Sequence, residues 1–418
     1  MTATDTIVER LAAGAVDEAA SRARAWLATH GFPHGRDEAW HYTPVDEILA
    51  TLAGAVPAAG PAGHLDRSIV DDLAGDHGGR RIVFVNGVYV PQLSDDRPLP
   101  PGFHFGPLAE PSGVPAMLGT PGGDPLDGFD ALNRLAAGEA AVVRSPPGAR
   151  LDSPLHVVHL GVPGRGTTAV HPRTFVHAAA ESRITVIETY AGLPGAMVTN
   201  ASSTVHVGAG AVVAYHRIQA EAPGVTHLGR TRIGQAAGSE LRAVSIMTGA
   251  DIARLTLDVV LNGREARTTL DGLYVPRHRQ RHDHVVTVDH GASAGTSRQR
   301  FKGIIDGHAR GSFGGRIIVR PGTVATDADQ SNHNLLLSST AQADTQPWLE
   351  IFADDVRCTH GATVGRLDDD ALFYLRSRGV PLAEARAMLI AAFADEVIAR
   401  IAPESLQQRV AATVHAKG

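Results

Sequence analysis

The amino-acid sequence predicts a mainly β protein with helices at both ends. Between about residues 156 and 352, short runs rich in β-branched residues follow one another at roughly ten-residue spacing, with Gly, Asn or Asp between them. No segment of useful length with the helical period interrupts these runs. The chain also holds 45 glycines but only 5% aromatic residues, which is typical of turn-rich β folds. A sandwich, a barrel and an irregular solenoid are all compatible with this pattern, whereas the absence of a strict short repeat excludes a regular hexapeptide helix.

The N-terminal region, residues 1–135, is expected to be helical and mixed. A first short helix can begin at Asp5, and a second fits residues 16–30. Gly31 is the expected end of the second helix, and Pro33 lies just beyond it.

The rest of this region contains turn signals and one hairpin signal. Residues 53–63 are rich in Ala, Gly and Pro and are expected to form a linker, and residues 98–128 are expected to be irregular. Asn86-Gly87 between two apolar runs predicts a β-hairpin over residues 81–90. A short helix is expected over residues 129–135.

The core region, residues 136–360, is expected to consist of strands. The expected strands cover residues 140–143, 184–190, 203–207, 211–219, 241–247, 254–261, 266–273, 284–289, 298–305 and 315–319.

The C-terminal region, residues 361–418, returns to the helical pattern. One helix is expected over residues 368–377 and an amphipathic one over residues 381–401, with Pro381 at its first turn. A last short helix can hold Leu406 and Val410. Such a helical tail can pack on the β body or dock a partner protein.

Composition and charge exclude several classes of protein. The formal net charge is −6 and the isoelectric point is about 6.4, which argues against nucleic acid as a partner. The single cysteine allows no intramolecular disulfide. No apolar stretch is long enough to span a membrane, and the N-terminal residues do not resemble a signal peptide. We therefore expect a cytoplasmic protein. The sequence also has no phosphate-binding loop and no nucleophile elbow.

Cys358 and His360 are the first candidate ligands. If residues 354–363 form a strand, these two side chains project from the same face. A thiol and an imidazole suit iron–sulfur or zinc chemistry, but two ligands cannot hold a metal ion alone, and clusters usually need four. Any cluster here must therefore take ligands from a second protein. On spacing alone, a structural role for Cys358 as a small buried apolar residue stays open.

His282 and His284 form a second candidate site, with His290 as a possible third ligand. The H-x-H pattern on a strand is a familiar metal pair, and His278 or Asp289 could also contribute. This pattern supports an alternative interpretation, a metal-dependent enzyme on a β scaffold. Residues 285–300 contain no glutamate, which weakens that alternative. Histidines that form hydrogen bonds along a β surface would explain the pattern equally well.

Several segments together resemble the SufB/SufD family of iron–sulfur cluster assembly proteins. The C-terminal signature is formed by residues 356–365 (VRCTHGATVG) and 372–379 (LFYLRSRG). Four further segments agree with the family: residues 36–44 (RDEAWHYTP), 83–87 (VFVNG), 297–303 (SRQRFKG) and 329–337 (DQSNHNLLL). The resemblance extends from about residue 31 to residue 401. The H-G-A-T run that begins at His360, together with the single cysteine, resembles the SufD branch rather than the SufB branch.

The resemblance implies a right-handed parallel β-helix core between a helical N-terminal region and a C-terminal helical domain. It implies a non-catalytic scaffold subunit that works with a SufB-type paralogue and a SufC-type ATPase, with the ATPase docking on the C-terminal helices. It also implies that Cys358 and His360 lie at the SufB interface, where they ligate or position iron or a transient iron–sulfur cluster that the two chains share. No cofactor is then expected to be tightly bound by the isolated chain, which could form a homodimer through β-helix edges.

Overall fold

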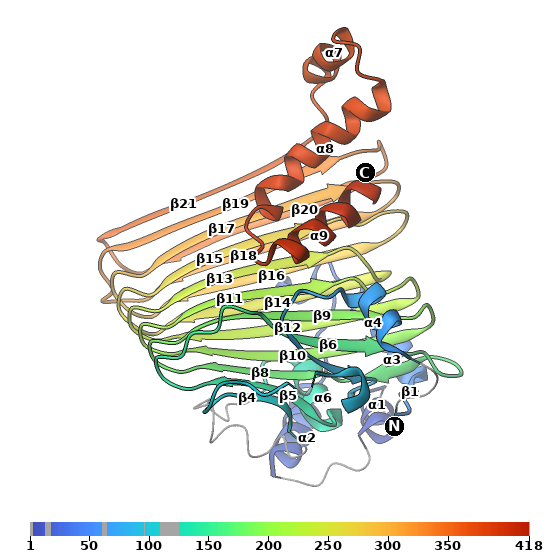
Figure 1. Ribbon diagram of the computed structural model, residues 1–418, viewed down its shortest axis with the longest axis vertical. Coiled ribbons are helices and arrows are strands. Elements are labelled where there is room, and N and C mark those ends of the chain that lie inside the picture. Colours follow the sequence, from blue (N-terminus) through green and yellow to red (C-terminus); the bar gives the residue numbers. More distant parts are fainter. Residues whose placement is uncertain (1–2, 13–17, 61–64, 96, 109–124, 418) are drawn as a thin grey trace.

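The computed structural model describes residues 3–12, 18–60, 65–95, 97–108 and 125–417, and its central feature is a parallel β-solenoid (Figure 1). Successive strands of the core alternate between two sheets, and the solenoid has about eight turns. Within each sheet, neighbouring strands of the solenoid are parallel and stack in register. The predicted mainly β class with helical ends is confirmed, and of the three architectures left open by the strand pattern, the solenoid is the observed one.

The first sheet contains β1 (Val56–Pro57), β4 (His104–Leu108), β5 (Ala140–Ser145), β7 (Thr168–Val170), β8 (Arg173–Ala178), β10 (Met197–Val207), β12 (Val225–Gln235), β14 (Ile252–Leu261), β16 (Arg281–His290), β18 (Arg310–Val319) and β20 (Gln342–Ile351). The second sheet contains β2 (Arg80–Val85), β3 (Val88–Tyr89), β6 (Leu155–Gly161), β9 (Arg183–Gly192), β11 (Val212–Gln219), β13 (Glu240–Met247), β15 (Arg267–Tyr274), β17 (Thr296–Ile305), β19 (Thr326–Leu336) and β21 (Val356–Gly365).

The described helices lie at the two ends of the chain. The N-terminal ones are α1 (Ala3–Leu11), α2 (Glu18–His30), η1 (Glu38–Trp40), α3 (Val45–Gly54), α4 (Arg67–Ala74), η2 (Pro91–Leu93) and α6 (Gly128–Ala136). The C-terminal ones are α7 (Asp369–Ser377), α8 (Leu382–Ile398) and α9 (Glu404–Lys417). In the part of the chain that the structure describes, no helix is both long and apolar enough to cross a membrane.

The turns on one side of the solenoid share a residue in the left-handed conformation. This residue recurs every 27 to 31 positions, at Glu181, Gly210, Gly238, Glu265, Ala294 and Ala325. Its backbone N–H donates to the corresponding turn of the next coil, as in the bonds from Gly210 to Ala237 and from Ala294 to Val324. The spacing varies and only two of these positions are glycine, so no strict repeat is visible in the sequence.

The interior of the solenoid is filled by alternate residues of the strands. Ile184, Val213, Leu241 and Phe301 are among the apolar side chains of this core, and each is at most 1% exposed. Because side chains alternate across a strand, the other residues face the outer surfaces of the two sheets. Helices cover parts of those outer surfaces.

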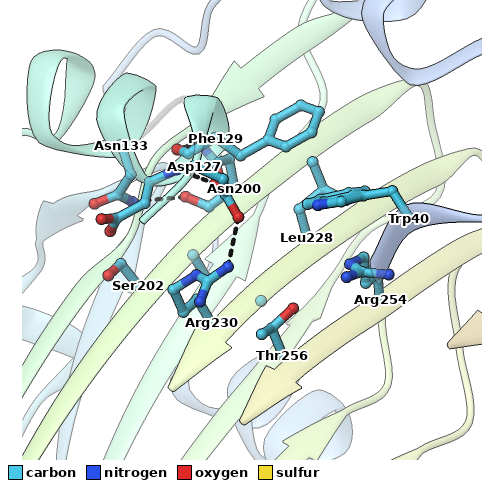
Figure 2. Close-up of a pocket in the computed structure, with 13 residues that line it drawn as sticks. Trp40, Asp127, Phe129, Asn133, Asn200, Ser202, Leu228, Arg230, Arg254 and Thr256 are labelled. Carbon is cyan, nitrogen blue, oxygen red and sulfur yellow. Dashed lines mark hydrogen bonds and ion pairs between the residues drawn. The ribbon is translucent and has the colours of Figure 1, made fainter. Parts of the chain in front are cut away.

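The N-terminal helices cover part of the outer face of the first sheet, through an apolar cluster and through paired charges (Figure 2). Asp127 caps α6 and forms an ion pair with Arg230 at 2.5 Å. Arg230 also forms an ion pair with Asp258 at 2.6 Å. The guanidinium of Arg254 lies 3.8 Å from the ring centroid of Trp40. Each arginine comes from a strand, so these contacts fix the N-terminal helices on the sheet.

Several local predictions are confirmed. The Asn86-Gly87 hairpin forms, with Phe84 opposite Tyr89. The second N-terminal helix begins at Glu18, and the expected start at residue 16 lies outside the described residues. Asp368 caps α7 through its side chain, and the last helix is longer than expected because it continues to Lys417.

Other local predictions were wrong. The expected linker over residues 53–63 includes the end of α3 and then β1, which pairs with β7. Of the segment expected to be irregular, residues 98–128, residues 109–124 lie outside the described residues, and the described part includes β4, which pairs antiparallel with β5. In both segments, tertiary pairing with a distant strand overrides the local turn signals.

Candidate functional site

The C-terminal end of the solenoid leaves strand edges without a described partner. Within the described residues, β20 pairs only with β18, and β21 pairs only with β19. Figure 1 shows these two strands as the last turn of the solenoid, at the end from which the C-terminal helices continue. Apolar side chains at this end are exposed, including Ile351 at 41%, Phe352 at 56% and Val364 at 47%. A partner protein can add a strand to an open edge and can bury exposed apolar side chains.

Cys358 and His360 lie on β21 and project from the same face of it. The parallel register places Cys358 beside Ala328 and His360 beside Gln330, both of which are buried on β19. The shared face is therefore the inner face of the solenoid, which the end of the chain leaves uncovered. The predicted side-by-side placement of the two ligands follows from this strand.

The two candidate ligands differ in their environment. Cys358 is partly buried and packs against a small apolar cluster that includes Ile317, Val319 and Ala328. Burial, and then the charge of Asp327, raise the pKa of the Cys358 thiol above its ordinary value. The thiol is therefore protonated at neutral pH and must lose that proton to bind a metal. His360 is exposed, and none of the described residues forms a hydrogen bond or ion pair with it that the structure records.

Two buried side-chain amides lie in line with His360 on the next two strands of the same sheet. Gln330 on β19 lies beside Gln299 on β17, and both are 1% exposed. Neither side-chain oxygen nor nitrogen of these two residues has a hydrogen-bond partner among the described atoms. Unsatisfied buried amides are costly, so they indicate a place where water or another polar group is accommodated.

Sequence reasoning missed these two glutamines. Gln330 lies in a segment that the sequence singles out only by its family resemblance, and Gln299 lies in an expected strand, residues 298–305, with no site assigned to it. A signal was available, because β19 has polar residues on its inward face as well as on its outward face. The register that stacks Gln299, Gln330 and His360 joins positions about 30 residues apart, and only the tertiary structure supplies it.

The alternative site at His282, His284 and His290 does not form a single cluster. All three side chains are buried on the inward face of β16. Each ring forms a hydrogen bond through its Nε2 atom. The partner of His282 is the Gly249 carbonyl oxygen, that of His284 is the Ser245 hydroxyl, and that of His290 is the Ser297 hydroxyl. His290 is six residues beyond His284, which corresponds to about 20 Å along an extended strand. A single metal ion cannot bind both, so the three-histidine interpretation was wrong.

The other proposed ligands do not complete that site. His278 lies in the turn before β16, and Asp289 faces outward, where its carboxylate pairs with Arg320 at 2.6 Å. Across the described residues, no group of three or more His, Cys, Asp or Glu side chains is arranged to hold a metal ion.

The helical tail presents an apolar surface of its own. The helices α8 and α9 pack on the outer face of the second sheet through Ile390, Val397 and Val410. In contrast, α7 has no buried residue, and Figure 1 shows it standing clear of the solenoid. Four large apolar side chains of α7 and α8 are exposed, and we refer to them together as the tail patch: Phe373 at 74%, Tyr374 at 57%, Leu382 at 49% and Met388 at 47%.

Comparisons with known proteins agree with this architecture. The family model described as "SUF system FeS cluster assembly, SufBD core domain" matches residues 162–393. The iron–sulfur cluster assembly protein SufD of Escherichia coli is 32% identical over 396 residues, which cover 93% of this chain and 90% of the relative.

A SufBD family protein of Synechocystis is also 32% identical, over 92% of this chain and 87% of the relative. A SufBD family protein of Mycobacterium tuberculosis is 29% identical over 91% of this chain and 88% of the relative. The chain therefore belongs to the SufBD family of iron–sulfur cluster assembly proteins.

Proposed function

We propose that this protein is a non-catalytic, cytoplasmic scaffold subunit that supports cluster assembly together with a SufB-type paralogue and a SufC-type ATPase. Iron or a nascent cluster is the cargo, and it is held between this chain and the SufB-type chain. His360 ligates or positions the iron, and Cys358 supports it. The observation that carries this proposal is that both side chains lie on the inner face of an edge strand with no described partner on its other side.

Ligand chemistry supports a shared site. Thiolate and imidazole are suitable ligands for iron in clusters, and a cluster usually needs four protein ligands. This chain brings two to the open end of the solenoid, so a partner strand along β21 could bring the others. The nearby unsatisfied amides of Gln299 and Gln330 offer further polar contacts to a cargo or to its water.

His360→Ala tests this role in the complex. Co-expressed with SufB-type and SufC-type partners and reconstituted with iron and sulfide without oxygen, the variant complex should assemble but carry severalfold less cluster. Iron and sulfide content and the visible absorption of the cluster measure this. His333→Ala is the matched control. His333 lies on the neighbouring strand β19, but its side chain is on the outer face, where it forms a hydrogen bond with the Thr363 hydroxyl. An unchanged cluster yield with His360→Ala would contradict the assigned role.

We also propose that the same open edges allow two copies of the isolated chain to form a homodimer. Two copies could pair along β20 and β21 until a SufB-type chain replaces one of them. Ile351→Lys places a charge at the end of β20 and should shift the isolated chain toward monomer in analytical ultracentrifugation. Leu126→Lys, at a site 54% exposed near α6, is the control. A dimer that persists equally in both variants would rule out pairing at this edge.

A further inference from the structure

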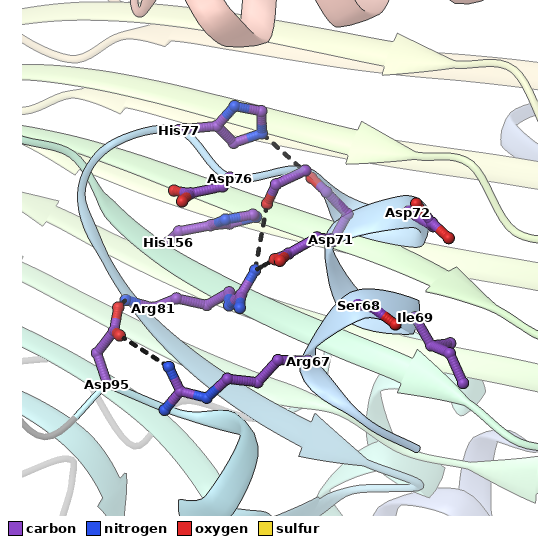
Figure 3. Close-up of polar contacts among 12 residues, drawn as sticks. Arg67, Ser68, Ile69, Asp71, Asp72, Asp76, His77, Arg81, Asp95 and His156 are labelled. Atoms are coloured by element: carbon purple, nitrogen blue, oxygen red, sulfur yellow. Dashed lines mark hydrogen bonds and ion pairs between the residues drawn. The ribbon is translucent and has the colours of Figure 1, made fainter. Parts of the chain in front are cut away.

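A polar cavity lies between α4, β2 and β6, away from the open end of the solenoid (Figure 3). It encloses about 480 Å³, part of which is open to solvent. We call it the arginine cavity, because Arg67, Arg81 and Arg97 line it from three different segments, together with Asp71, Asp95 and His156. All of these residues lie outside the region that the family model matches.

Arg81 lines this cavity and has an unused donor edge. Its side chain is 11% exposed. Nη1 donates to the Asp71 carboxylate at 2.5 Å and to the Gly75 carbonyl oxygen at 3.4 Å. Nε is buried without an acceptor, and no described residue accepts from Nη2. The Nε and Nη2 edge of a guanidinium is the fork that binds two oxygens of a carboxylate or phosphate at once.

The other two arginines are held in place by the backbone. Arg67 donates to the carbonyl oxygens of Gln92 at 3.3 Å and Ser94 at 2.6 Å, which leaves its Nη1 3.6 Å from Asp95. Arg97 donates to the Gly79 carbonyl oxygen at 2.7 Å. These bonds fix the two guanidinium groups, which share the single carboxylate of Asp95 as their ion-pair partner.

The carboxylates around the cavity already have donors. Asp71 is bound by Nη1 of Arg81, and Asp95 accepts from the Arg81 backbone N–H at 2.9 Å and from Arg97 at 3.2 Å. Asp76 accepts from the backbone N–H of Gly78 at 2.9 Å. These contacts leave the free edge of Arg81 without a carboxylate partner among the described residues.

A fourth arginine lies close to the cavity. Arg409 of α9 reaches the end of α4 and donates to the backbone carbonyl oxygens of Asp71 and Asp72. Burial first, and then the charge of Arg409 among others, lower the pKa of His77 on the cavity wall. The lining holds three guanidinium groups and three carboxylates, and Asp72 balances the charge of Arg409, so binding of an anion depends on the free fork of Arg81 and not on a net positive charge.

We propose that the arginine cavity binds a small oxyanion, with phosphate or carboxylate oxygens accepting from Nε and Nη2 of Arg81 and from Nη1 of Arg67. The site would be separate from the Cys358 and His360 end of the protein. It would lie where α9 meets α4, so an occupied cavity would join the N-terminal region to the helical tail.

Calorimetric titration of the full chain with inorganic phosphate, at constant ionic strength set by chloride, tests the proposal. Saturable binding is expected, and Arg81→Lys, which keeps the charge but removes the fork, should abolish it. Arg67→Gln should weaken binding about tenfold, because it removes one charged donor. Arg67 is 52% exposed, so this variant should fold even if Arg81→Lys does not. A parallel titration with acetate distinguishes a phosphoryl from a carboxylate ligand.

Arg242→Gln is the matched control, since Arg242 is 63% exposed and pairs with Glu240 on the outer face of β13. Absence of saturable binding to either anion would overturn the proposal. So would equal weakening by Arg67→Gln and Arg242→Gln, because that would mean only a general charge effect. None of these results depends on cluster assembly, so this site and the proposed function can fail separately.

Discussion

Glu188 and Arg217 are charged residues inside the solenoid, where water cannot compensate them. The Glu188 carboxylate lies 3.7 Å from the Arg217 guanidinium, and the two side chains are 0% and 3% exposed. The carboxylate also accepts from the hydroxyls of Tyr190 at 2.6 Å and Ser203 at 2.8 Å. Burial alone would raise the pKa of Glu188, but the charges of Arg217 and then His159, together with hydrogen bonds such as that from Tyr190, hold it below its ordinary value.

Glu188→Leu should destabilise the protein by about 3–5 kcal/mol, because it leaves the Arg217 charge buried without a partner. Combining it with Arg217→Met should recover part of that loss. Urea unfolding of both variants measures the difference. Arg242→Ala, at an exposed ion pair, should change the free energy of unfolding by less than about 1 kcal/mol. If Glu188→Leu were as mild as Arg242→Ala, the interior pair would not be essential.

The helical tail, α7 to α9, is partly packed on the solenoid and partly exposed. Lys302 of β17 is buried beneath α8, where its Nζ lies 2.8 Å from Glu396 and 3.0 Å from the Phe393 carbonyl oxygen. This contact fixes the second half of α8 on the sheet, whereas the tail patch on α7 and the start of α8 stays exposed. We infer that the tail patch is the docking surface for the SufC-type ATPase.

Replacing both Phe373 and Tyr374 with Ala should reduce co-purification of a SufC-type ATPase by about tenfold or more, because exposed aromatic side chains are frequent anchors at interfaces. Both side chains are more than half exposed, so the free energy of unfolding should change by less than about 0.5 kcal/mol. Leu126→Ala is the control. Undiminished ATPase recovery with the double variant would place the docking surface elsewhere.

Buried histidines affect the whole molecule, because they lie along the length of the solenoid. Burial lowers the pKa of His159, His171, His216 and His290 to about 4 and that of His284 to about 3. An unfolded histidine has a pKa of about 6.5. The unfolded chain therefore takes up protons first as the pH falls. The stability from these groups is present above about pH 6.5 and is lost progressively toward pH 4.

The free energy of unfolding should therefore be several kcal/mol lower at pH 5 than at pH 7.5, since each buried histidine costs roughly 1.4 kcal/mol per pH unit in this window. Urea titrations at the two pH values measure it. His216→Leu should reduce the pH dependence, while His308→Asn, at an exposed turn position, should leave it unchanged. Equal stability at pH 5 and pH 7.5 would show that these rings are accessible to protons in the folded protein.

The strand pattern and the family motifs together determined much of the fold. Alternating apolar runs located most strands of the core, and capping residues such as Asp368 located the C-terminal helices. The strands β12 and β19 escaped the pattern because polar residues occupy many of their positions, including buried ones such as Asn332. The solenoid itself was implied by resemblance, since its turns repeat in conformation and not in residue type.

The sequence by itself determined that Cys358 and His360 project from one face, because spacing along a single strand is a local property. Only the tertiary structure decided that their strand lies at an open edge, that Gln330 and Gln299 line up behind His360, and that three arginines meet in one cavity. Those relations join residues distant in the chain. They depend on parallel register and on which elements pack together, and local sequence patterns do not specify either.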